Sequence, residues 1–199
     1  MTRNPVLVMG LLIASLLGPI ASAFAQAVPG NEWSHGTTLG LSAGSATASE
    51  TQGTLGAALG WEINHRVEVE GTGAWLIARH GDEAFAAELK VVASLTRPNT
   101  VVPFVGAGIG MYRATFDLTA GALPDFYQRR LTQAPGETRA IFADPSYVFS
   151  AGFDIFTGKH VSFRPELSVR LVTRASDTYA VTMATVRATY HFELHDVAR

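Results

Sequence analysis

The stretch His160–Leu171, "HVSFRPELSVRL", alternates charged or hydroxyl side chains with apolar ones. A period of two is typical of a β-strand, whose successive side chains point to opposite faces. One face would carry Arg164, Glu166 and Arg170, and the other only apolar residues such as Leu167. A conventional core strand would not bury the charged face, and a solvated loop would not be so regular. The fold therefore depends on what surrounds the apolar face.

The same alternation recurs along the chain and predicts an all-β fold. Eight stretches carry it: Gly36–Gly44, Thr54–Ile63, Arg66–Leu76, Phe85–Leu95, Val101 onward, Tyr147–Ile155, His160–Leu171 and Thr178–Phe192. Arg113 falls on the apolar face of the fifth stretch, so the pattern leaves the end of that stretch open. Pro165 lacks a backbone donor, which predicts a bulge or a local break in the seventh.

Short and long connections alternate between these stretches. Turn residues make tight joins at Asn64–His65, at 97–100 ("RPNT") and at 157–160 ("TGKH"), while the other joins are longer. An up-and-down antiparallel set of this kind has tight turns at one end and loops at the other. We expect residues 116–145 to form a long surface loop, in which Pro124 and Asp125 are typical of the start of a short helix but which can equally be irregular. The alternative is an extra hairpin, which would give ten strands.

Residues 1–27 have the pattern of a cleavable secretory signal peptide. Arg3 precedes a long apolar run, and small residues then offer cleavage after Ala25 or Ala27. The alternative is an uncleaved membrane helix, because the apolar run approaches the length of a bilayer span.

The composition is apolar for a soluble domain, with 47% hydrophobic and 16% charged residues. Without residues 1–27 the chain keeps 14 Lys plus Arg against 17 Asp plus Glu, a net charge of −3, because only Arg3 is lost. This balance gives no case for nucleic-acid binding. The chain has no cysteine, which excludes disulfides and thiolate chemistry. Beyond residue 27 no apolar run is long enough for a membrane helix, so this part is either soluble or crosses a membrane as strands.

The polar faces of the stretches hold small residues interspersed with six acids and five bases. These are Glu62, Arg66, Glu68, Glu70, Glu88, Lys90, Asp154, Arg164, Glu166, Arg170 and Arg187. We expect them to pair with one another as a polar network in the lumen of a barrel, while the apolar faces meet lipid. A soluble exported barrel would have the opposite arrangement, and alternation alone does not exclude it.

Aromatic residues gather near both ends of the expected strands. Toward the tight turns lie Trp61, Phe153, Phe163, Tyr190 and Phe192, and toward the loops lie Trp75, Phe85, Tyr147 and Tyr179. Two such girdles suit the two interfaces of a membrane. With the N-terminal signal they predict an eight-stranded antiparallel up-and-down transmembrane β-barrel in a bacterial outer membrane, built from residues 28–199 with its strands within about 36–193.

Three motifs carry a resemblance: "PFVGAGIG" at Pro103–Gly110, "FRPELSVR" at Phe163–Arg170 and "ATYHF" ending at Phe192. Over most of residues 34–193 the chain resembles the small outer-membrane barrels of the porin family or outer-membrane β-barrel domain, and is similar to the membrane domain of OmpA. The resemblance implies insertion by the barrel-assembly machinery, which reads a terminal aromatic residue. This chain departs from the family by continuing with "ELHDVAR".

We weighed several candidates for a chemical site. Glycines 106, 108 and 110 lack the strand-to-helix turn of a nucleotide loop. The histidines at 191 and 195 would lie roughly 13 Å apart on a strand, too far to share a metal ion. Residues Glu68 and Glu70 are interleaved with bases, as in a structural network. The sequence therefore predicts no cofactor and no metal.

A lipid A-modifying enzyme is the enzymatic alternative. His160 and Ser162 have the spacing found in a lipid A deacylase that resembles a serine hydrolase. Phe163 replaces the asparagine of that motif, and His160 lies at a tight turn on the expected periplasmic side, whereas the deacylase acts at the outer leaflet. We therefore expect no catalytic residues.

Eight strands enclose an interior just wide enough for side chains to fill, so free diffusion of nutrients is not expected. This predicts a structural, envelope or surface-interaction protein, with a narrow porin-like channel as the alternative. The expected partners are outer-membrane lipids and lipopolysaccharide, and a host or surface ligand could bind the loops. Arg129 and Arg130 in the long segment are candidates for a phosphate contact.

Overall fold

The computed structural model describes residues 36–48, 51–64, 66–77, 82–97, 99–119, 123–131, 137–158, 160–174 and 177–193. The expected signal peptide, residues 1–27, lies outside these ranges, and so does His195. Within them, no helix is long and apolar enough to cross a membrane.

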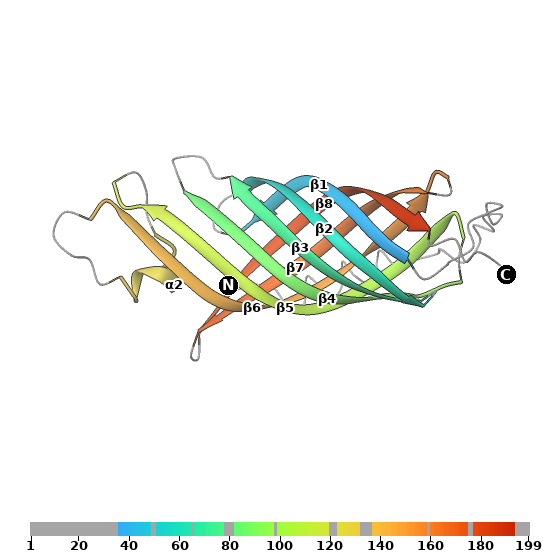
Figure 1. The fold of residues 1–199 in the computed structure, drawn as a ribbon. Coiled ribbons are helices and arrows are strands. Elements are labelled where there is room, and N and C mark those ends of the chain that lie inside the picture. Colours follow the sequence, from blue (N-terminus) through green and yellow to red (C-terminus); the bar gives the residue numbers. More distant parts are fainter. Residues whose placement is uncertain are drawn as a thin grey trace, which may run out of the picture.

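Eight strands close into a barrel in sequence order, each antiparallel to its neighbours, with β8 paired to β1 (Figure 1). They are β1 (Gly36–Thr47), β2 (Thr51–Asn64), β3 (Val67–Ile77), β4 (Glu83–Ser94), β5 (Val101–Asp117), β6 (Arg139–Phe156), β7 (Val161–Arg174) and β8 (Asp177–Glu193). The predicted eight-stranded up-and-down barrel is confirmed, and among the described residues the ten-stranded alternative is wrong.

The two ends of the barrel differ in their connections. The turn end carries the connections β2–β3, β4–β5 and β6–β7, and the loop end carries the connections β1–β2, β3–β4, β5–β6 and β7–β8. The short helix α2 (Asp125–Gln128) follows Pro124 at the loop end, which is one of the forms that the sequence left open for this segment. Figure 1 shows β5 and β6 reaching beyond the other strands at this end.

The predicted bounds of the long loop, 116–145, are wrong. β5 continues to Asp117 and β6 begins at Arg139, so the connection is residues 118–138. The expected strict alternation of short and long joins is also wrong, since only residues 175–176 join β7 to β8. At the start of β6 both faces are apolar, since Ala140 and Phe142 are buried inside while Ile141 and Ala143 face outward, and the sequence there lacks the polar alternation that reveals a strand.

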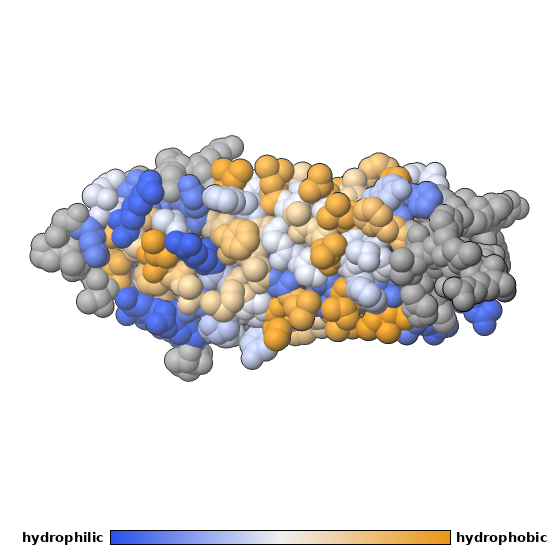
Figure 2. All heavy atoms as spheres, in the orientation of Figure 1, coloured by the Kyte–Doolittle hydropathy of each residue, from blue (hydrophilic) through white to orange (hydrophobic). Residues whose placement is uncertain are grey.

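Alternation sorts the side chains between the inside and the outside of the barrel. On β6, Ala140, Phe142 and Asp144 are buried, while Ile141 and Ala143 between them are exposed. Large apolar side chains cover the outside, including Leu41 at 69% exposure and Ile109 at 62%. Figure 2 shows apolar side chains over the middle of the barrel and hydrophilic ones gathered near the loop end.

Pro165 causes a local break and no bulge. The β6–β7 ladder stops after the pair Gly152–Glu166 and resumes at Ile155–Phe163 in the same register. Pro165 itself stays in register with Val186 of β8. The missing donor therefore interrupts one ladder without shifting any side chain to the other face.

Candidate functional site

The lumen is the candidate functional site, and β7 runs through all of its levels. From the turn end to the loop end, its inward side chains are Ser162, Arg164, Glu166, Ser168, Arg170 and Val172. Each inward residue faces different partners from the opposite wall. The stretch that opened the sequence analysis therefore lies at the centre of the site.

Arg164 links several carboxylates in the part of the lumen near the turn end. Its Nε lies 2.5 Å from Oδ1 of Asp154 and its Nη2 2.9 Å from Oδ2, which makes a bidentate salt bridge. Nη1 donates to Glu70 at 2.8 Å and Nη2 to Glu68 at 2.9 Å. The guanidinium also lies 4.9 Å from the ring centre of Phe104. Such a fork uses the planar geometry of arginine, which lysine cannot reproduce.

A second group of charges lies next to Arg164 and shares Glu70 with it. Lys90 Nζ lies 2.5 Å from Glu166 and 3.1 Å from Glu70. Arg187 bonds to Glu70 and donates to Glu166 at 2.8 Å. All four side chains are less than 10% exposed. The charges are satisfied across the barrel, from β3, β4, β7 and β8, so this network ties opposite walls together.

Glycines on neighbouring strands make the room that these long side chains need. A Cβ atom on Gly40 would lie 2.5 Å from Cδ of Arg187. A Cβ atom on Gly108 would lie 2.6 Å from both Cα and Cβ of Lys90. The glycines that resemble part of a nucleotide loop in the sequence therefore serve the packing of a charged core.

A separate charge pair lies above this network, toward the loop end. Arg170 bonds to Glu88 from across the lumen, and its Nη1 lies 3.2 Å from the sulfur of Met183. A cavity of about 30 Å³ lies beside the pair, lined also by Lys90 and Glu166. This is the volume of about one water molecule, far too small to act as a channel for nutrients.

The turn end of the lumen brings together a serine, a histidine and a glutamate. Ser162 Oγ lies 2.9 Å from His191 Nε2, and His191 Nδ1 lies 3.2 Å from Oε1 of Glu62. His160, the histidine that the sequence pairs with Ser162, instead lies with Nδ1 3.0 Å from the carbonyl oxygen of His191. The side chain of Ser162 is fully buried. A nucleophile needs access to its substrate as well as a base, so this geometry alone does not make an active site.

An aromatic plug closes the loop end of the lumen. α2 carries Tyr127 into the barrel, where its ring centre lies 4.8 Å from that of Phe142 and 4.9 Å from that of Phe116. Tyr127 is fully buried, and burial raises the pKa of its phenol, which stays neutral. The plug consists of Tyr112, Phe116, Phe126, Tyr127, Phe142 and Tyr179.

The two loop arginines belong to this plug region. Arg130 stacks on Phe126 at 3.9 Å from the ring centre, and its Nη1 lies 3.6 Å from Asp144. Arg129 pairs at 3.3 Å with Asp177 and is 66% exposed. Arg130 is thus engaged inside the fold, which leaves Arg129 the more accessible of the two.

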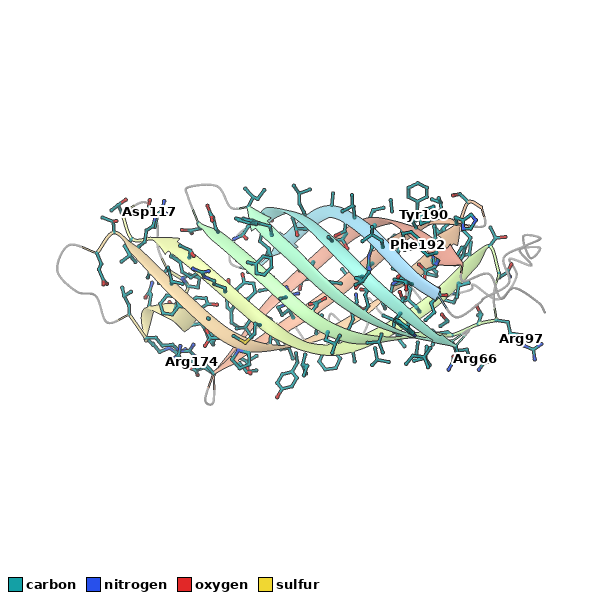
Figure 3. All side chains as sticks on the ribbon, viewed as in Figure 1. Arg66, Arg97, Asp117, Arg174, Tyr190 and Phe192 are labelled. Atoms are coloured by element: carbon teal, nitrogen blue, oxygen red, sulfur yellow. The ribbon has the colours of Figure 1, made fainter. Side chains whose placement is uncertain are left out.

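Two predicted positions are wrong. Arg66 does not enter the lumen: Asn64 Oδ1 accepts the backbone amides of Arg66 and Val67, so β3 starts only at Val67 and Arg66 lies exposed in the turn (Figure 3). Tyr179 does not face the membrane: it shares the inward face of β8 with Val181 and packs on the rings of the plug.

The other predicted network residues all point into the barrel. They are Glu62, Glu68, Glu70, Glu88, Lys90, Asp154, Arg164, Glu166, Arg170 and Arg187. This set holds six acids and four bases, since Arg66 lies outside. The lumen therefore carries an excess of acid, and Glu62 lies beside His191 at its turn end.

The other predicted girdle residues lie on the outer face. Trp61, Trp75, Phe85, Tyr147, Phe163, Tyr190 and Phe192 are each more than 40% exposed, and Phe153 is partly exposed. Figure 3 shows Tyr190 and Phe192 near the end that carries Arg66 and Arg97, which is the turn end. Tyr190 packs edge-on against Phe192 at 4.8 Å.

Several polar residues of the lumen were not predicted from the sequence. Thr38 donates to Glu68 at 2.7 Å, and Asp144 is buried beside Arg174 at 3.3 Å. The parity of β1 and β8 would have placed Thr38 and His191 inside. Asp144 lies where β6 passes the predicted loop boundary, and no pattern in that segment indicated a strand. Among the described residues no group of three His, Cys, Asp or Glu side chains could hold a metal ion.

Comparison with known proteins agrees with this architecture. The family model "Outer membrane protein beta-barrel domain" matches residues 11–192. The N-terminal barrel domain of Pseudomonas aeruginosa OprF is similar in structure, with a TM-score of 0.57 and 12% identity over 78% of this chain and 97% of that domain. Neisserial surface protein A has a TM-score of 0.58 and 10% identity over 79% of this chain and 96% of its own. P. aeruginosa OprG has a TM-score of 0.51 and 10% identity over 82% of this chain and 99% of its own. No curated protein matches the chain in sequence.

Proposed function

Because the chain belongs to the outer membrane protein β-barrel domain family, we propose that it acts as a closed envelope barrel, which strengthens the outer membrane and holds its loop end at the cell surface. The family places the chain in the bacterial outer membrane. Short turns of such barrels face the periplasm, and longer loops face outward. The loop end, with α2 and residues 118–138, is therefore the surface end.

The filled lumen is the observation that carries this proposal. Moving through the barrel, a solute would meet the Ser162–His191–Glu62 group, the network around Arg164, the Arg170–Glu88 pair and the aromatic plug. Ionic cross-links between opposite walls suit a barrel that must stay rigid and closed. A narrow channel, the alternative, would require the Arg164 network to open.

A barrier assay tests the proposed role in cells. Deleting the gene should raise sensitivity to a large antibiotic that intact outer membranes exclude, and supplying the full chain should restore resistance. A matched variant whose residues 118–138 are replaced by a short turn separates the two parts of the proposal. We expect this variant to restore resistance to the antibiotic, but to lose binding to any molecule that contacts the loop end. Unchanged sensitivity after deletion, together with slower uptake of a small solute, would overturn the proposal in favour of a channel.

Hydrolysis is the second candidate, and the hydrogen-bonded chain from Ser162 through His191 to Glu62 is the observation in its favour. A reactive serine would be labelled by a fluorophosphonate probe and would change the acyl pattern of lipid A on expression. We expect neither effect, because Ser162 is fully buried and lies at the turn end. Labelling that disappears in Ser162→Ala would favour the enzyme.

A further inference from the structure

Arg113 lies outside the barrel, on the face that carries the apolar side chains. On β5 it follows Ile109 and Met111, which are 62% and 51% exposed, and it is itself exposed. Its cross-strand neighbours are Phe85 on β4 and Ala143 on β6, and neither carries a charge. An arginine at this position needs an explanation, because the lumen network does not use it and a lipid-facing charge is unfavourable.

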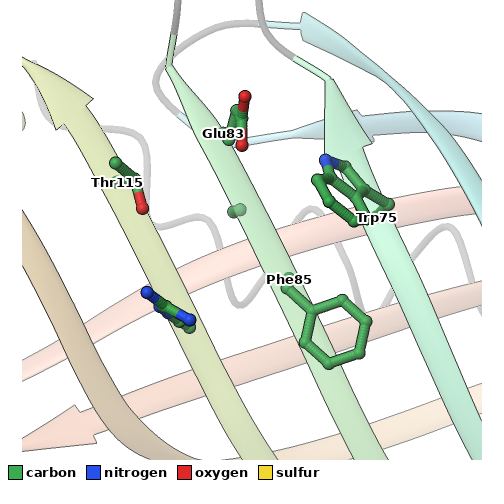
Figure 4. A pocket seen from close by; sticks show the side chains of 6 residues that line it. Trp75, Glu83, Phe85 and Thr115 are labelled. Carbon is green, nitrogen blue, oxygen red and sulfur yellow. The ribbon is translucent and has the colours of Figure 1, made fainter.

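A groove opens beside Arg113 near the loop end (Figure 4). Its volume is about 370 Å³, and its lining residues are Trp75, Glu83, Ala84, Phe85, Arg113 and Thr115. They come from three adjacent strands, β3, β4 and β5. The groove is therefore formed by strands of the barrel wall and not by a loop.

The groove has an apolar side and a polar side. Trp75 and Phe85 are directly paired across β3 and β4, and their rings meet edge to face with centres 6.3 Å apart. Two pairs beyond Phe85–Arg113 toward the loop end, Glu83 lies opposite Thr115. Figure 4 shows Glu83 and Thr115 on one side and the two aromatic rings on the other. The polar side faces the surface, and the aromatic side faces the membrane.

The ring of Phe85 lies over Gly73 of β3. A Cβ atom at Gly73 would lie 3.5 Å from Cζ of Phe85, which is an ordinary contact distance. Two pairs from Trp75–Phe85, away from the loop end, Gly73 lies opposite Ala87, and neither has a large side chain. An acyl chain that runs along β3 would therefore meet no large side chain at this pair.

We propose that this groove binds the phosphorylated glycolipid of the outer leaflet. Arg113 binds a phosphate on the sugar, because guanidinium groups pair with phosphate through two parallel hydrogen bonds. Glu83 and Thr115 accept and donate hydrogen bonds to sugar hydroxyls, and the rings of Trp75 and Phe85 pack against the first part of an acyl chain. One cation, two polar groups and two rings in this order match a phosphorylated sugar that carries lipid chains.

The inference rests on the proposed orientation, in which the loop end faces outward. Its test is independent of the barrier assay and of conductance, since it measures binding to purified protein. A leaky or conducting barrel could still bind the lipid, and a closed barrel could fail to bind it.

The experiment is native mass spectrometry of the folded full-length protein in detergent, titrated with lipid A. Arg113→Gln should weaken the binding at least tenfold, while Arg113→Lys should lose only part of it, because lysine keeps the charge but not the fork. Arg66→Gln is the matched control, since it removes the same charge from the turn end and should leave binding unchanged. Lipid A without its phosphates should bind the wild-type protein and Arg113→Gln with the same affinity.

Three results would overturn the inference. The first is equal binding of lipid A by the wild-type protein and Arg113→Gln. The second is equal binding of lipid A and dephosphorylated lipid A by the wild-type protein, which decides the question even if Arg113→Gln does not fold. The third is equal binding of phosphatidylglycerol and lipid A, which would mean that Arg113 attracts any anionic lipid.

Discussion

Arg164 of β7 and Asp154 of β6 form a bidentate salt bridge inside the barrel, with Nε 2.5 Å from Oδ1 and Nη2 2.9 Å from Oδ2. The same guanidinium donates to Glu68 and Glu70. One side chain therefore satisfies three buried carboxylates, and the stability of the lumen should depend on it.

Replacing Arg164 by methionine should destabilise the barrel by about 3–5 kcal/mol, because it leaves buried carboxylates without their cation. Urea titration in lipid vesicles, followed by tryptophan fluorescence, would measure the loss. Arg66→Met removes an exposed arginine from a turn and should change little. Equal urea midpoints for the two variants would contradict the assignment of Arg164 to the core.

The assignment of faces can be tested on adjacent residues of β7. Leu167→Arg places a charge on the lipid side and should cost about 2–4 kcal/mol near the middle of the bilayer. Ser168 lines the small lumen cavity, so Ser168→Ala should have little effect. Folding yield into vesicles, read from the heat-dependent shift in gel mobility, would compare them. Similar yields for both variants would mean that the faces are assigned wrongly.

The glycines of β5 give a test of lumen packing. In Gly108→Ala the new methyl group would collide with the backbone of β4 at Lys90, and we expect a loss of about 1–3 kcal/mol. Gly53→Ala is the matched control, because a Cβ atom there meets nothing within 4 Å. The urea midpoint of Gly108→Ala should fall while that of Gly53→Ala stays or rises. A midpoint unchanged in both would show that the wall can move to admit the methyl group.

The aromatic plug should protect the loop that carries α2. Tyr127→Ala removes a fully buried ring and should cost about 3–5 kcal/mol of local packing. The loop would then open more often, and trypsin would cut after Arg129 or Arg130 much faster in the folded barrel. Asp125→Ala changes an exposed residue of the same helix and should be cut at the wild-type rate. Equal cleavage of both variants would mean that Tyr127 does not hold the loop.

The alternation of residues predicted the strand number, the closure and the inward direction of most charges. It worked for the opening stretch because a membrane requires one apolar face without exception. It failed where the inner face is apolar as well. Near its start at Arg139, β6 buries Ala140 and Phe142 in the plug and exposes Ile141, so no polar face marks the strand and the sequence suggested a loop.

The errors within the site have local causes. Arg66 follows the alternation of β3, but its backbone amide donates a hydrogen bond to the side chain of Asn64, which keeps Arg66 in the turn. Tyr179 is aromatic and near a strand end, which suggests an interface, yet its parity on β8 points it inside. The pairing of Ser162 with His191 could not be predicted, because it depends on the register of β7 against β8.

Single-channel recording in planar bilayers tests the central claim, a barrel closed by its own side chains, most directly. The purified wild-type protein should give no discrete conductance steps. Arg164→Ser combined with Tyr127→Ala removes the centre of the ion network and of the plug, and should give small, cation-selective steps, because the lumen holds more acids than bases. Discrete steps from the wild-type protein, with the same size as those of the double variant, would contradict the account.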